Sequence, residues 1–473
     1  MRFAELDAAD IAVWGGGREG RSVLAALARR LPGKPLTVYC GASEIQAVRD
    51  AYGSAGTLGI SADSDGDPSP FAIRTQPPDA DALASHDVVI KSPGISAYRP
   101  ELLAAQERGT RFTSGTALWF GENVSGTRDD VRVVAVTGTK GKSTTTAMIA
   151  HCARALGTRT ALAGNIGLPL LDLDGQRADL WAIELSSFQT GEAGPVEVGV
   201  IVSLGEEHLD WHGTRERYVA DKLKLADVAR TLLVDADSAL LMQRTAAHPR
   251  RKLFGGVDGW HVAGAAIHRG REPIVAVGDL PLHGLHNARN ACAALAAIEL
   301  LGLDAGAAAA SLRDFKPLPH RLTSLGTSDG IEWIDDSIST TPDAALAALL
   351  SLQGRDVTLI LGGFDRGLAW HAFAEALARQ PPRAVVTQGA AGPRIARVLR
   401  EARIDCAIDE TSDLAAAVAL ARERTPPGGV VLLSPGAPSF DQFKDYAERG
   451  RVFARIARLD GNAIGEIAGL GIA

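Results

Sequence analysis

The chain has 473 residues, 46% of them hydrophobic and 22% charged, with a net charge of −7 at neutral pH, and at about 150 residues per domain this length predicts roughly three domains. No apolar run reaches the roughly 18 residues that cross a bilayer, and acidic residues interrupt the N-terminus before a signal peptide develops, so we expect a cytoplasmic protein without membrane insertion. The four cysteines form no CxxC pair, which argues against structural zinc and disulfides, and the negative charge argues mildly against a nucleic-acid partner.

The first part of the chain alternates strands and helices as an α/β domain does. Short apolar runs at residues 11–14, 36–40 and 87–90 predict strands. Residues 61–78 are rich in Asp, Ser, Gly and Pro and predict a surface loop. Residues 121–130 are the expected linker to the next domain.

A glycine-rich turn, residues 15–20 (GGGREG), follows the first of these strands and matches the pattern GxGxxG. Alone, the pattern is weak evidence for NAD, because a dinucleotide site also needs an acid at the tip of the next strand to hold the ribose. Residues 40–43 contain no acid, and Glu44 comes only afterwards. The turn therefore favours another diphosphate, such as a UDP-sugar, while NAD and a purely structural turn stay open.

A second glycine-rich loop follows a β-branched strand expected at residues 131–136. Residues 137–143 (TGTKGKS) break that strand and lead into a helix. Backbone N–H groups, the helix N-terminus and Lys142 would then surround phosphate oxygens, with Ser143 placed to bind Mg²⁺. The full Walker pattern needs a glycine where Val136 stands, so the loop is a shortened variant, and a structural turn without nucleotide is the alternative.

Polar residues at the ends of the next two strands indicate a metal site. Glu184 closes an apolar strand, where a buried carboxylate needs a partner such as Mg²⁺. A strand expected at residues 198–204 ends in residues 205–212 (GEEHLDWH). No cysteine accompanies this cluster, so Mg²⁺ is favoured over zinc, and a hydrogen-bonded loop without metal stays open.

The last part of the chain begins near residues 317–321 and predicts another α/β domain. Strands are expected at residues 357–361, 384–387 and 430–433, and polar loops follow apolar stretches at residues 335–337, 362–367 and 434–439. Strands separated by helices form mostly parallel sheets, whose carboxyl ends hold ligands. The three loops therefore predict a rim for a small polar substrate, although each taken singly also fits a solvated loop.

Taken together, seven motifs occur in the order found in the Mur ligases of peptidoglycan synthesis, and the chain resembles that family over essentially its whole length. The motifs are TGTKGKS (137–143), GNIG (164–167), ELSSFQ (184–189), EEHLDWHG (206–213), LHNARN (285–290), PHR (319–321) and SPGAPSFDQFKDY (434–446). The resemblance implies an α/β protein of three domains. These are a Rossmann-like domain for a UDP substrate at residues 1–124, a central P-loop ATPase domain with a mostly parallel sheet at 125–317, and a Rossmann-like domain for an amino acid at 318–473.

The resemblance also implies a set of nucleotide and metal residues. The residues that it implies for ATP binding are Gly138, Thr139, Lys140, Gly141, Lys142, Ser143, Thr144, Asn287, Asn290, Arg321 and Asp336. The residues implied for Mg²⁺ binding are Ser143, Glu184, His208 and Lys222. The catalytic residues that the resemblance implies are Lys142, Glu184, His208 and Lys222. Lys222 matches the lysine that such ligases carbamylate with CO₂. An amine would repel Mg²⁺, whereas its carbamate is an anion that can bind it.

Within the family, the chain looks like the ligases that add glutamate to UDP-N-acetylmuramoyl-L-alanine through an acyl phosphate, with release of ADP and phosphate. The resemblance implies that the UDP substrate is bound by Gly15, Gly17, Ser92 and Asn165. It implies that glutamate is bound by Thr340, Arg366, Ser439 and Tyr446. Ligases specific for D-glutamate commonly read Asp-Ser-Lys-Ala-Thr-Asn where residues 336–341 read DSISTT, without the lysine. This departure favours L-glutamate, with D-glutamate as the alternative, and implies a separate epimerase that inverts the product.

Two other functions stay open from the residues alone. One is a nicotinamide-dependent oxidoreductase that uses the first glycine turn. The other is a nucleotide-binding protein without ligase chemistry. Nothing in the sequence reports the oligomeric state, and a monomer is the default expectation.

Overall fold

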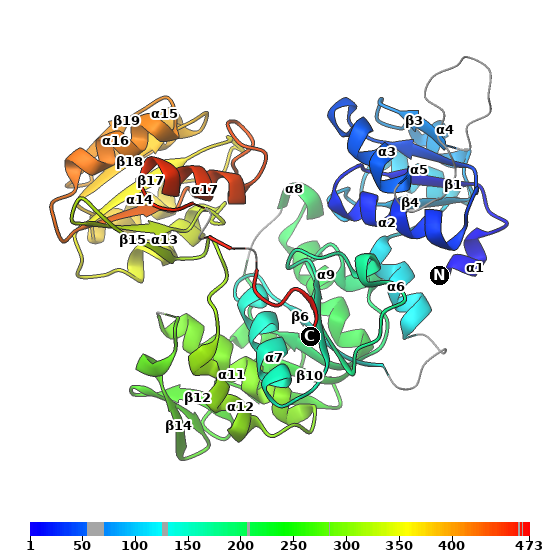
Figure 1. Ribbon diagram of the computed structural model, residues 1–473, viewed down its shortest axis with the longest axis horizontal. Helices are drawn as coiled ribbons and strands as arrows, with labels where there is room; N and C mark the ends of the chain where they lie inside the picture. Colours follow the sequence, from blue (N-terminus) through cyan, green and yellow to red (C-terminus); the bar gives the residue numbers. More distant parts are fainter. Residues whose placement is uncertain (54–70, 125–130, 206–208, 283, 462–463, 466) are drawn as a thin grey trace. The chain divides into compact units, whose positions relative to one another are not determined.

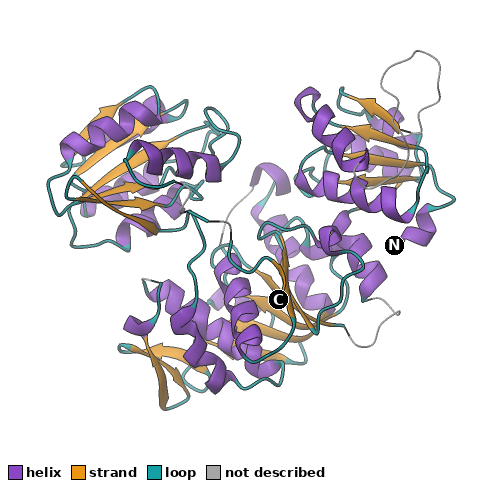
Figure 2. Cartoon of the chain, viewed as in Figure 1, coloured by secondary structure: helices purple, strands orange, loops and turns teal. Residues whose placement is uncertain are grey.

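The computed structural model describes residues 1–53, 71–124, 131–205, 209–282, 284–461, 464–465 and 467–473 (Figure 1). The chain divides into two compact units: unit 1 comprises Met1–Phe315 with Gly469–Ala473, and unit 2 comprises Lys316–Ala468. Figure 2 shows helices alongside the strands in both units. Among the described residues, no helix is long and apolar enough to cross a membrane.

The N-terminal part of unit 1 is a parallel five-stranded sheet with the order β3-β2-β1-β4-β5. Its strands are β1 (Ile11–Trp14), β2 (Leu36–Tyr39), β3 (Phe71–Arg74), β4 (Val88–Lys91) and β5 (Arg111–Thr113), and its helices are α1 (Phe3–Leu6), α2 (Arg18–Arg30), α3 (Ile45–Gly53), α4 (Ala80–Ala84) and α5 (Pro100–Glu107). All four residues of β1 are buried, because alternate side chains point into cores on the two faces of the sheet. This strand order matches the first five strands of the Rossmann order 3-2-1-4-5-6.

The central part of unit 1 contains a seven-stranded sheet with the order β11-β10-β9-β6-β8-β7-β21. Its strands are β6 (Arg132–Thr137), β7 (Thr160–Gly164), β8 (Leu180–Glu184), β9 (Val196–Ile201), β10 (Ala229–Asp235), β11 (Arg251–Phe254) and β21 (Gly471–Ile472). The helices of this part are α6 (Gly115–Asn123), α7 (Lys142–Ala155), α8 (Leu209–His212), α9 (Arg215–Val228), α10 (Ala239–Arg244), α11 (Leu285–Leu300) and α12 (Ala305–Ser311). A three-stranded antiparallel sheet of β12 (Trp260–Ala263), β13 (Ala266–Arg269) and β14 (Glu272–Ala276) precedes α11.

The strand β21 is the antiparallel edge of the central sheet and comes from the end of the described chain. It pairs with β7. The Arg154 guanidinium donates to the carbonyl oxygens of Gly469 (2.7 Å), Gly471 (2.8 Å) and Thr160 (2.7 Å). The last five residues, Gly469–Ala473, therefore belong to unit 1, and β21 among them covers the edge of the central sheet at β7.

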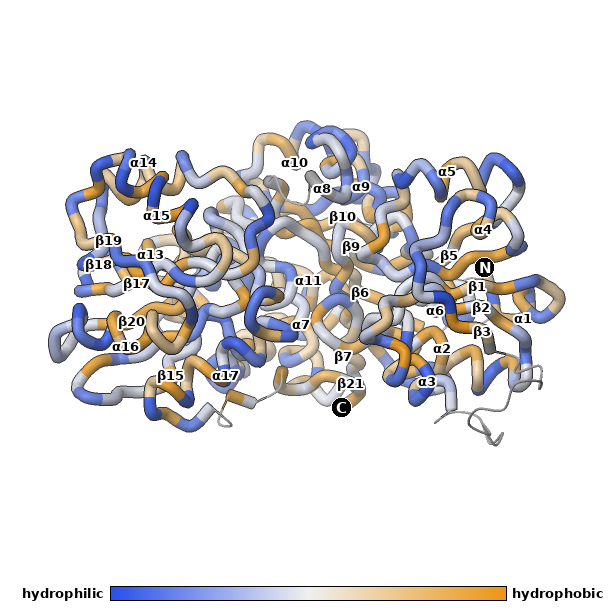
Figure 3. Tube along the Cα trace, turned by 90° about the horizontal axis from the view of Figure 1, so that it is seen from above, coloured by the Kyte–Doolittle hydropathy of each residue, from blue (hydrophilic) through white to orange (hydrophobic). Residues whose placement is uncertain are grey.

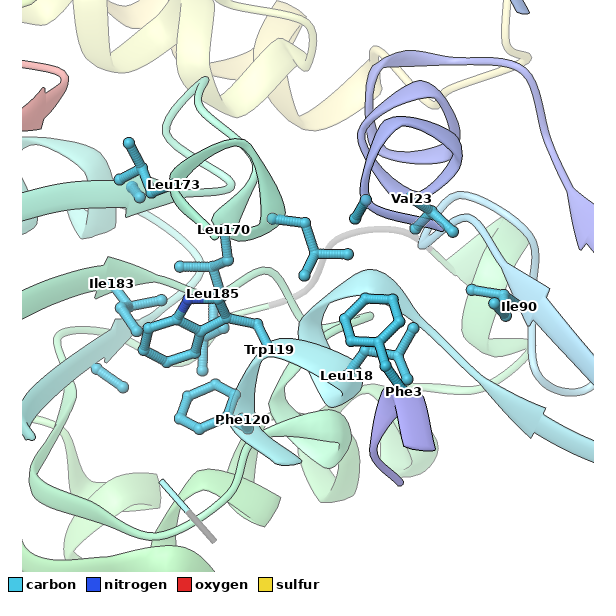
Figure 4. Close-up of a cluster of buried hydrophobic side chains, with 14 of the residues drawn as sticks. Phe3, Val23, Ile90, Leu118, Trp119, Phe120, Leu170, Leu173, Ile183 and Leu185 are labelled. Atoms are coloured by element: carbon cyan, nitrogen blue, oxygen red, sulfur yellow. The ribbon is translucent and has the colours of Figure 1, made fainter. Parts of the chain in front are cut away.

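A shared apolar core joins the two sheets of unit 1 around α6 (Figure 4). Trp119 and Phe120 are buried, and they lie between side chains of the central sheet, such as Ile183, and side chains of the N-terminal part, such as Val23. A Cβ at Gly121 would overlap the Met1 carbonyl oxygen. This packing keeps residues 121–123 helical, so the expected linker 121–130 begins too early; residues 125–130 lie outside the described part.

Unit 2 is a six-stranded sheet with the order β15-β16-β20-β17-β18-β19, parallel except for β15. The strands are β15 (Thr323–Ser328), β16 (Ile331–Asp335), β17 (Val357–Gly362), β18 (Ala384–Gln388), β19 (Ala407–Glu410) and β20 (Val430–Leu433), and the helices are α13 (Pro342–Leu350), α14 (His371–Arg379), α15 (Gly392–Glu401), α16 (Leu414–Arg424) and α17 (Tyr446–Ile456). Separate apolar cores cover its two faces, and Figure 3 shows the inner strands β17 and β20 mainly in hydrophobic colours. The predicted α/β fold class with mostly parallel sheets is confirmed.

Candidate functional site

The phosphate loop lies between the buried strand β6 and the helix α7, as the motif predicts. Gly138 and Gly141 have φ of 157° and 82°, which an L side chain rarely adopts. A Cβ at Gly141 would also overlap Asn290 Oδ1. Lys142 begins α7, so the loop presents the free N–H groups of a helix start, where an anion binds favourably.

Asn290 and Asn287 approach this loop from α11. Asn290 Nδ2 donates to Asn287 Oδ1 over 3.3 Å, and Asn287 is buried. The contact between Gly141 and Asn290 places the LHNARN motif against the phosphate loop.

Glu184 ends β8 and is fully buried, with 0% of its surface exposed. Its Oε1 accepts from Asn165 Nδ2 at 2.8 Å. Its Oε2 is buried and has no hydrogen-bond partner among the described residues. A buried carboxylate oxygen without a donor is costly, and a hard cation such as Mg²⁺ is the partner that would satisfy it.

Lys222 lies on α9 with only 2% of its surface exposed. Its Nζ donates to the Gly138 carbonyl oxygen at 2.8 Å and lies 5.0 Å from the centre of the Tyr218 ring. The Tyr218 hydroxyl is 2.8 Å from Thr139 Oγ1. Lys222, 84 residues away in sequence, therefore contacts the phosphate loop directly.

The EEHLDWHG motif is described only in part, and His208 lies outside the described residues. His212 is buried, with Nδ1 2.7 Å from Asp221 Oδ2 and Nε2 3.0 Å from Ser187 Oγ. Both nitrogens of this ring are therefore used in hydrogen bonds. The described residues contain no group of three or more His, Cys, Asp or Glu side chains placed to hold a metal ion.

The first glycine turn meets Ser92 at the carboxyl ends of β1 and β4. Gly15 has φ of 109°, and a Cβ there would meet Ser92 Oγ at 2.5 Å. Gly17 caps α2 and has open space where a Cβ would point. The sequence analysis set Glu44 aside because it follows the strand tip. In the structure a short 3-10 turn brings the Glu44 side chain back beside Gly16.

In unit 2, Asp336 follows β16 and is buried. It accepts from Ser339 Oγ (2.5 Å), Ser434 Oγ (2.7 Å) and Leu322 N (3.2 Å). Burial raises its pKa to about 6, against the effect of these hydroxyls and of Arg321. Arg321 Nε is buried and has no hydrogen-bond partner among the described residues.

The four residues expected to receive glutamate lie in four separate segments of unit 2. Ser439 is buried after β20, Thr340 is half-buried before α13, and Arg366 is exposed after β17. Tyr446 begins α17, with its ring 5.8 Å from that of His320.

Arg449, which the sequence interpretation missed, ties the loops after β16 and β20 together. It is fully buried, donates from Nε to Ser337 Oγ at 2.9 Å, and donates from Nη2 to the carbonyls of Ser337 (2.8 Å) and Ala437 (3.0 Å). Burial lowers the pKa of its guanidinium to about 10. Its place on the first turns of α17 gave no local signal, because the contacts come from distant loops.

The parallel central sheet, with a strand that breaks into a glycine loop and a helix, defines a phosphate-loop nucleotide-binding protein of the α/β class. Residues 136–298 match the Mur ligase middle domain, and residues 320–436 match the Mur ligase glutamate ligase domain. The chain belongs to the Mur ligase family.

Relatives align along the whole chain. A protein of Xanthomonas axonopodis pv. citri is 46% identical over 100% of both chains, one of Xylella fastidiosa strain Temecula1 is 44% identical over 100% of both, and one of Salinispora tropica is 36% identical over 97% of this chain and 99% of its own. Each is named UDP-N-acetylmuramoyl-L-alanine--L-glutamate ligase.

Solved structures share the fold at low identity. The UDP-N-acetylmuramate–alanine ligase of Thermotoga maritima aligns with a TM-score of 0.60 and 19% identity over 95% of this chain and 99% of its own. A MurF ligase of the same organism, crystallised with ADP, aligns with a TM-score of 0.55 and 18% identity over 90% of this chain and 94% of its own.

Proposed function

We propose that this chain joins L-glutamate to UDP-N-acetylmuramoyl-L-alanine, using ATP and releasing ADP and phosphate. The observation that carries the proposal is the full-length likeness to relatives named for that reaction. The phosphate loop supports the ATP-dependent step, because its glycines and helix start suit a triphosphate. Forming an amide from a carboxylate is uphill, so the γ-phosphoryl group is first transferred to the substrate carboxylate, and the glutamate amine then displaces phosphate.

ATP is assigned to the phosphate loop, to two asparagines of α11 and to two residues of unit 2. Lys142 and the first turn of α7 offset the charge that develops during transfer. Further contacts are assigned to Gly138, Thr139, Lys140, Gly141, Ser143, Thr144, Asn287, Asn290, Arg321 and Asp336. The closeness of Asn290 to Gly141 and of Lys222 to Gly138 supports this assignment.

Mg²⁺ is assigned to Ser143, Glu184, His208 and the carbamate of Lys222. The bound ion would neutralise charge on the phosphate oxygens. The orphaned Glu184 Oε2 supports a cation beside β8. Carbamylation turns the Lys222 amine into an anion, and the buried place of that amine beside the phosphate loop supports the modification there.

The UDP substrate is assigned to Gly15, Gly17, Ser92 and Asn165. Asn165 hydrogen-bonds to Glu184, which links the assigned substrate contact to the assigned metal ligand. Glutamate is assigned to Thr340, Arg366, Ser439 and Tyr446 in the domain proposed to span 318–473, after the domains 1–124 and 125–317. Ile338 stands where D-glutamate ligases commonly carry lysine, which supports L-glutamate and a separate epimerase downstream. A cytoplasmic monomer completes the proposal.

A phosphate-release assay tests the reaction. ATP, UDP-N-acetylmuramoyl-L-alanine and either L- or D-glutamate are supplied in parallel, with reactions lacking each substrate as controls. We expect release with L-glutamate and at least about tenfold less with D-glutamate. Equal release with both would refute the stereochemical assignment, and no release with either would refute the ligase.

The carbamate has its own test. Lys222→Ala should lose activity that short carboxylates, such as formate and acetate, partly restore by occupying the site of the anion. Lys252→Ala, which removes an exposed lysine from β11, is the control. Failure of every added carboxylate to rescue Lys222→Ala would count against the carbamate.

A further inference from the structure

Asp221, the residue directly before Lys222, has a buried carboxylate that joins three parts of unit 1. Only 4% of its surface is exposed. The carboxylate accepts from the Tyr98 hydroxyl at 2.9 Å and from Lys224 Nζ at 2.6 Å, and it lies 2.7 Å from His212 Nδ1. These three partners satisfy both oxygens of the buried carboxylate.

The same position is fastened to the turn that follows Glu184. Thr190 Oγ1 donates to the Asp221 carbonyl oxygen at 2.6 Å, and His212 carries the contact onward to Ser187 Oγ at 3.0 Å. The middle of α9 is therefore held by the segment after β8, through the backbone and the side chain of Asp221.

The segment after Ser92 is fastened to α8 and α9 as well. Trp211 Nε1 donates to the Pro93 carbonyl oxygen at 3.0 Å, and Ser96 Oγ donates to the Trp211 carbonyl oxygen at 2.6 Å. Tyr98, two residues after Ser96, donates its hydroxyl hydrogen to the Asp221 carboxylate. Burial together with this hydrogen bond raises the Tyr98 pKa to about 12. These bonds run from the segment after β4 to the helix that carries Lys222.

Consecutive residues of a helix point about 100° apart, and here the two neighbours serve different segments. Lys222 reaches the Gly138 carbonyl oxygen of the phosphate loop, whereas Asp221 reaches Tyr98 and His212. Through Lys222 and Asp221, this turn of α9 is therefore bonded to the phosphate loop on one side and to the segments that contain Tyr98 and His212 on the other.

We propose that Asp221 is a positioning residue, which holds Lys222 against the phosphate loop through its bonds to Tyr98 and His212. The proposal rests on the proposed function for its catalytic consequence. Without the Asp221 charge, His212 and Tyr98 lose a common acceptor, and the first turns of α9 are free to shift by an amount that matters to a reacting group. Asp221 itself touches no reacting atom in this scheme.

The variant Asp221→Asn tests the proposal by activity. We expect kcat for phosphate release to fall about tenfold or more while the KM values for ATP and the UDP substrate stay within about threefold. Asp227→Asn, an exposed aspartate on the same helix, is the matched control and should behave as the parent chain. A kcat for Asp221→Asn within about twofold of the parent, even with a lower melting temperature, overturns the proposal.

A second measurement does not depend on activity. The lysine amines are labelled with acetic anhydride in CO₂-free buffer, and the extent at Lys222 is read by mass spectrometry relative to the exposed Lys140. We expect labelling of Lys222 to quicken about tenfold in Asp221→Asn, because local opening exposes it. Unchanged labelling overturns the proposal, and inactivity of the parent chain would refute the ligase while leaving this readout to decide on Asp221.

If Asp221→Asn does not fold, Tyr98→Phe decides the question. This variant keeps the carboxylate and its bonds to His212 and Lys224 and removes one donor. Tyr98→Phe should lower kcat and speed the labelling of Lys222, each by a smaller factor than Asp221→Asn. If kcat and labelling both equal those of the parent chain, the proposal is overturned.

Discussion

Replacing Glu19 by glutamine should make the chain more stable near neutral pH and leave its stability at acid pH nearly unchanged. Glu19 lies in the first turn of α2, after the glycine turn. Burial is the largest of the causes that raise its pKa from 4.5 to about 7; the nearby charges of Asp172 and Glu192 act in the same direction, and Arg18 opposes them. The fold therefore favours the protonated form of this carboxyl.

The sign and size follow from proton linkage. In the unfolded chain the carboxyl ionises near 4.5, whereas in the folded chain it ionises near 7. Between these values unfolding releases a proton, so the parent chain loses stability as the pH rises through this window and loses no more above it. At about 1.4 kcal/mol for each pKa unit, the loss amounts to at most roughly 3 kcal/mol. Glu19→Gln does not ionise and avoids the loss.

Urea unfolding of the parent and of Glu19→Gln, at a series of pH values from about 4 to about 8, measures the effect. The difference in unfolding free energy should grow with pH and level off above about 7. Glu107→Gln removes one exposed carboxylate from α5 and is the matched control. A difference between parent and Glu19→Gln that does not change with pH would refute the reasoning.

Three further changes have expected outcomes. Gly141→Ala should weaken ATP binding measured by calorimetry, since φ of 82° costs about 1 kcal/mol for alanine and its Cβ would overlap Asn290 Oδ1; unchanged affinity would contradict this. Arg449→Ala should lower the unfolding free energy of unit 2 by about 3 kcal/mol in urea titrations, because buried carbonyls lose their donors; a loss below about 1 kcal/mol would count against it. Arg154→Ala should speed amide exchange at Ala473 about tenfold by removing the donors that hold β21, and parent-like exchange would speak against this clamp.

Local patterns predicted the elements whose signals are local. The strand expected at residues 11–14 is β1 to the residue, since an apolar run meets a glycine turn there. The strand β3 was missed, because its four residues lie inside the stretch 61–78 that reads as a loop, and its pairing with β2 supplies what its own sequence lacks. The pairing of β21 with β7 joins residues about 310 positions apart, which no local pattern records.

The site residues, too, divide into those that a local sequence pattern predicts and those that only the packing of distant segments brings together. The phosphate loop is visible in seven consecutive residues, and Glu184 is visible as an acid at the end of an apolar strand. The approach of Lys222 to Gly138 came only from family resemblance, because it depends on how α9 packs. The role of Asp221 was missed altogether, since a single aspartate on a helix is normally solvated.

The edge strand β21 has a consequence for the order of folding. It comes after all of unit 2 in the chain, yet it belongs to the sheet of unit 1. During synthesis from the N-terminus, the edge of β7 therefore stays open while about 300 further residues leave the ribosome. Open sheet edges invite pairing with other chains, so a ribosome-bound intermediate that ends within unit 2 should be more prone to aggregate than the finished protein.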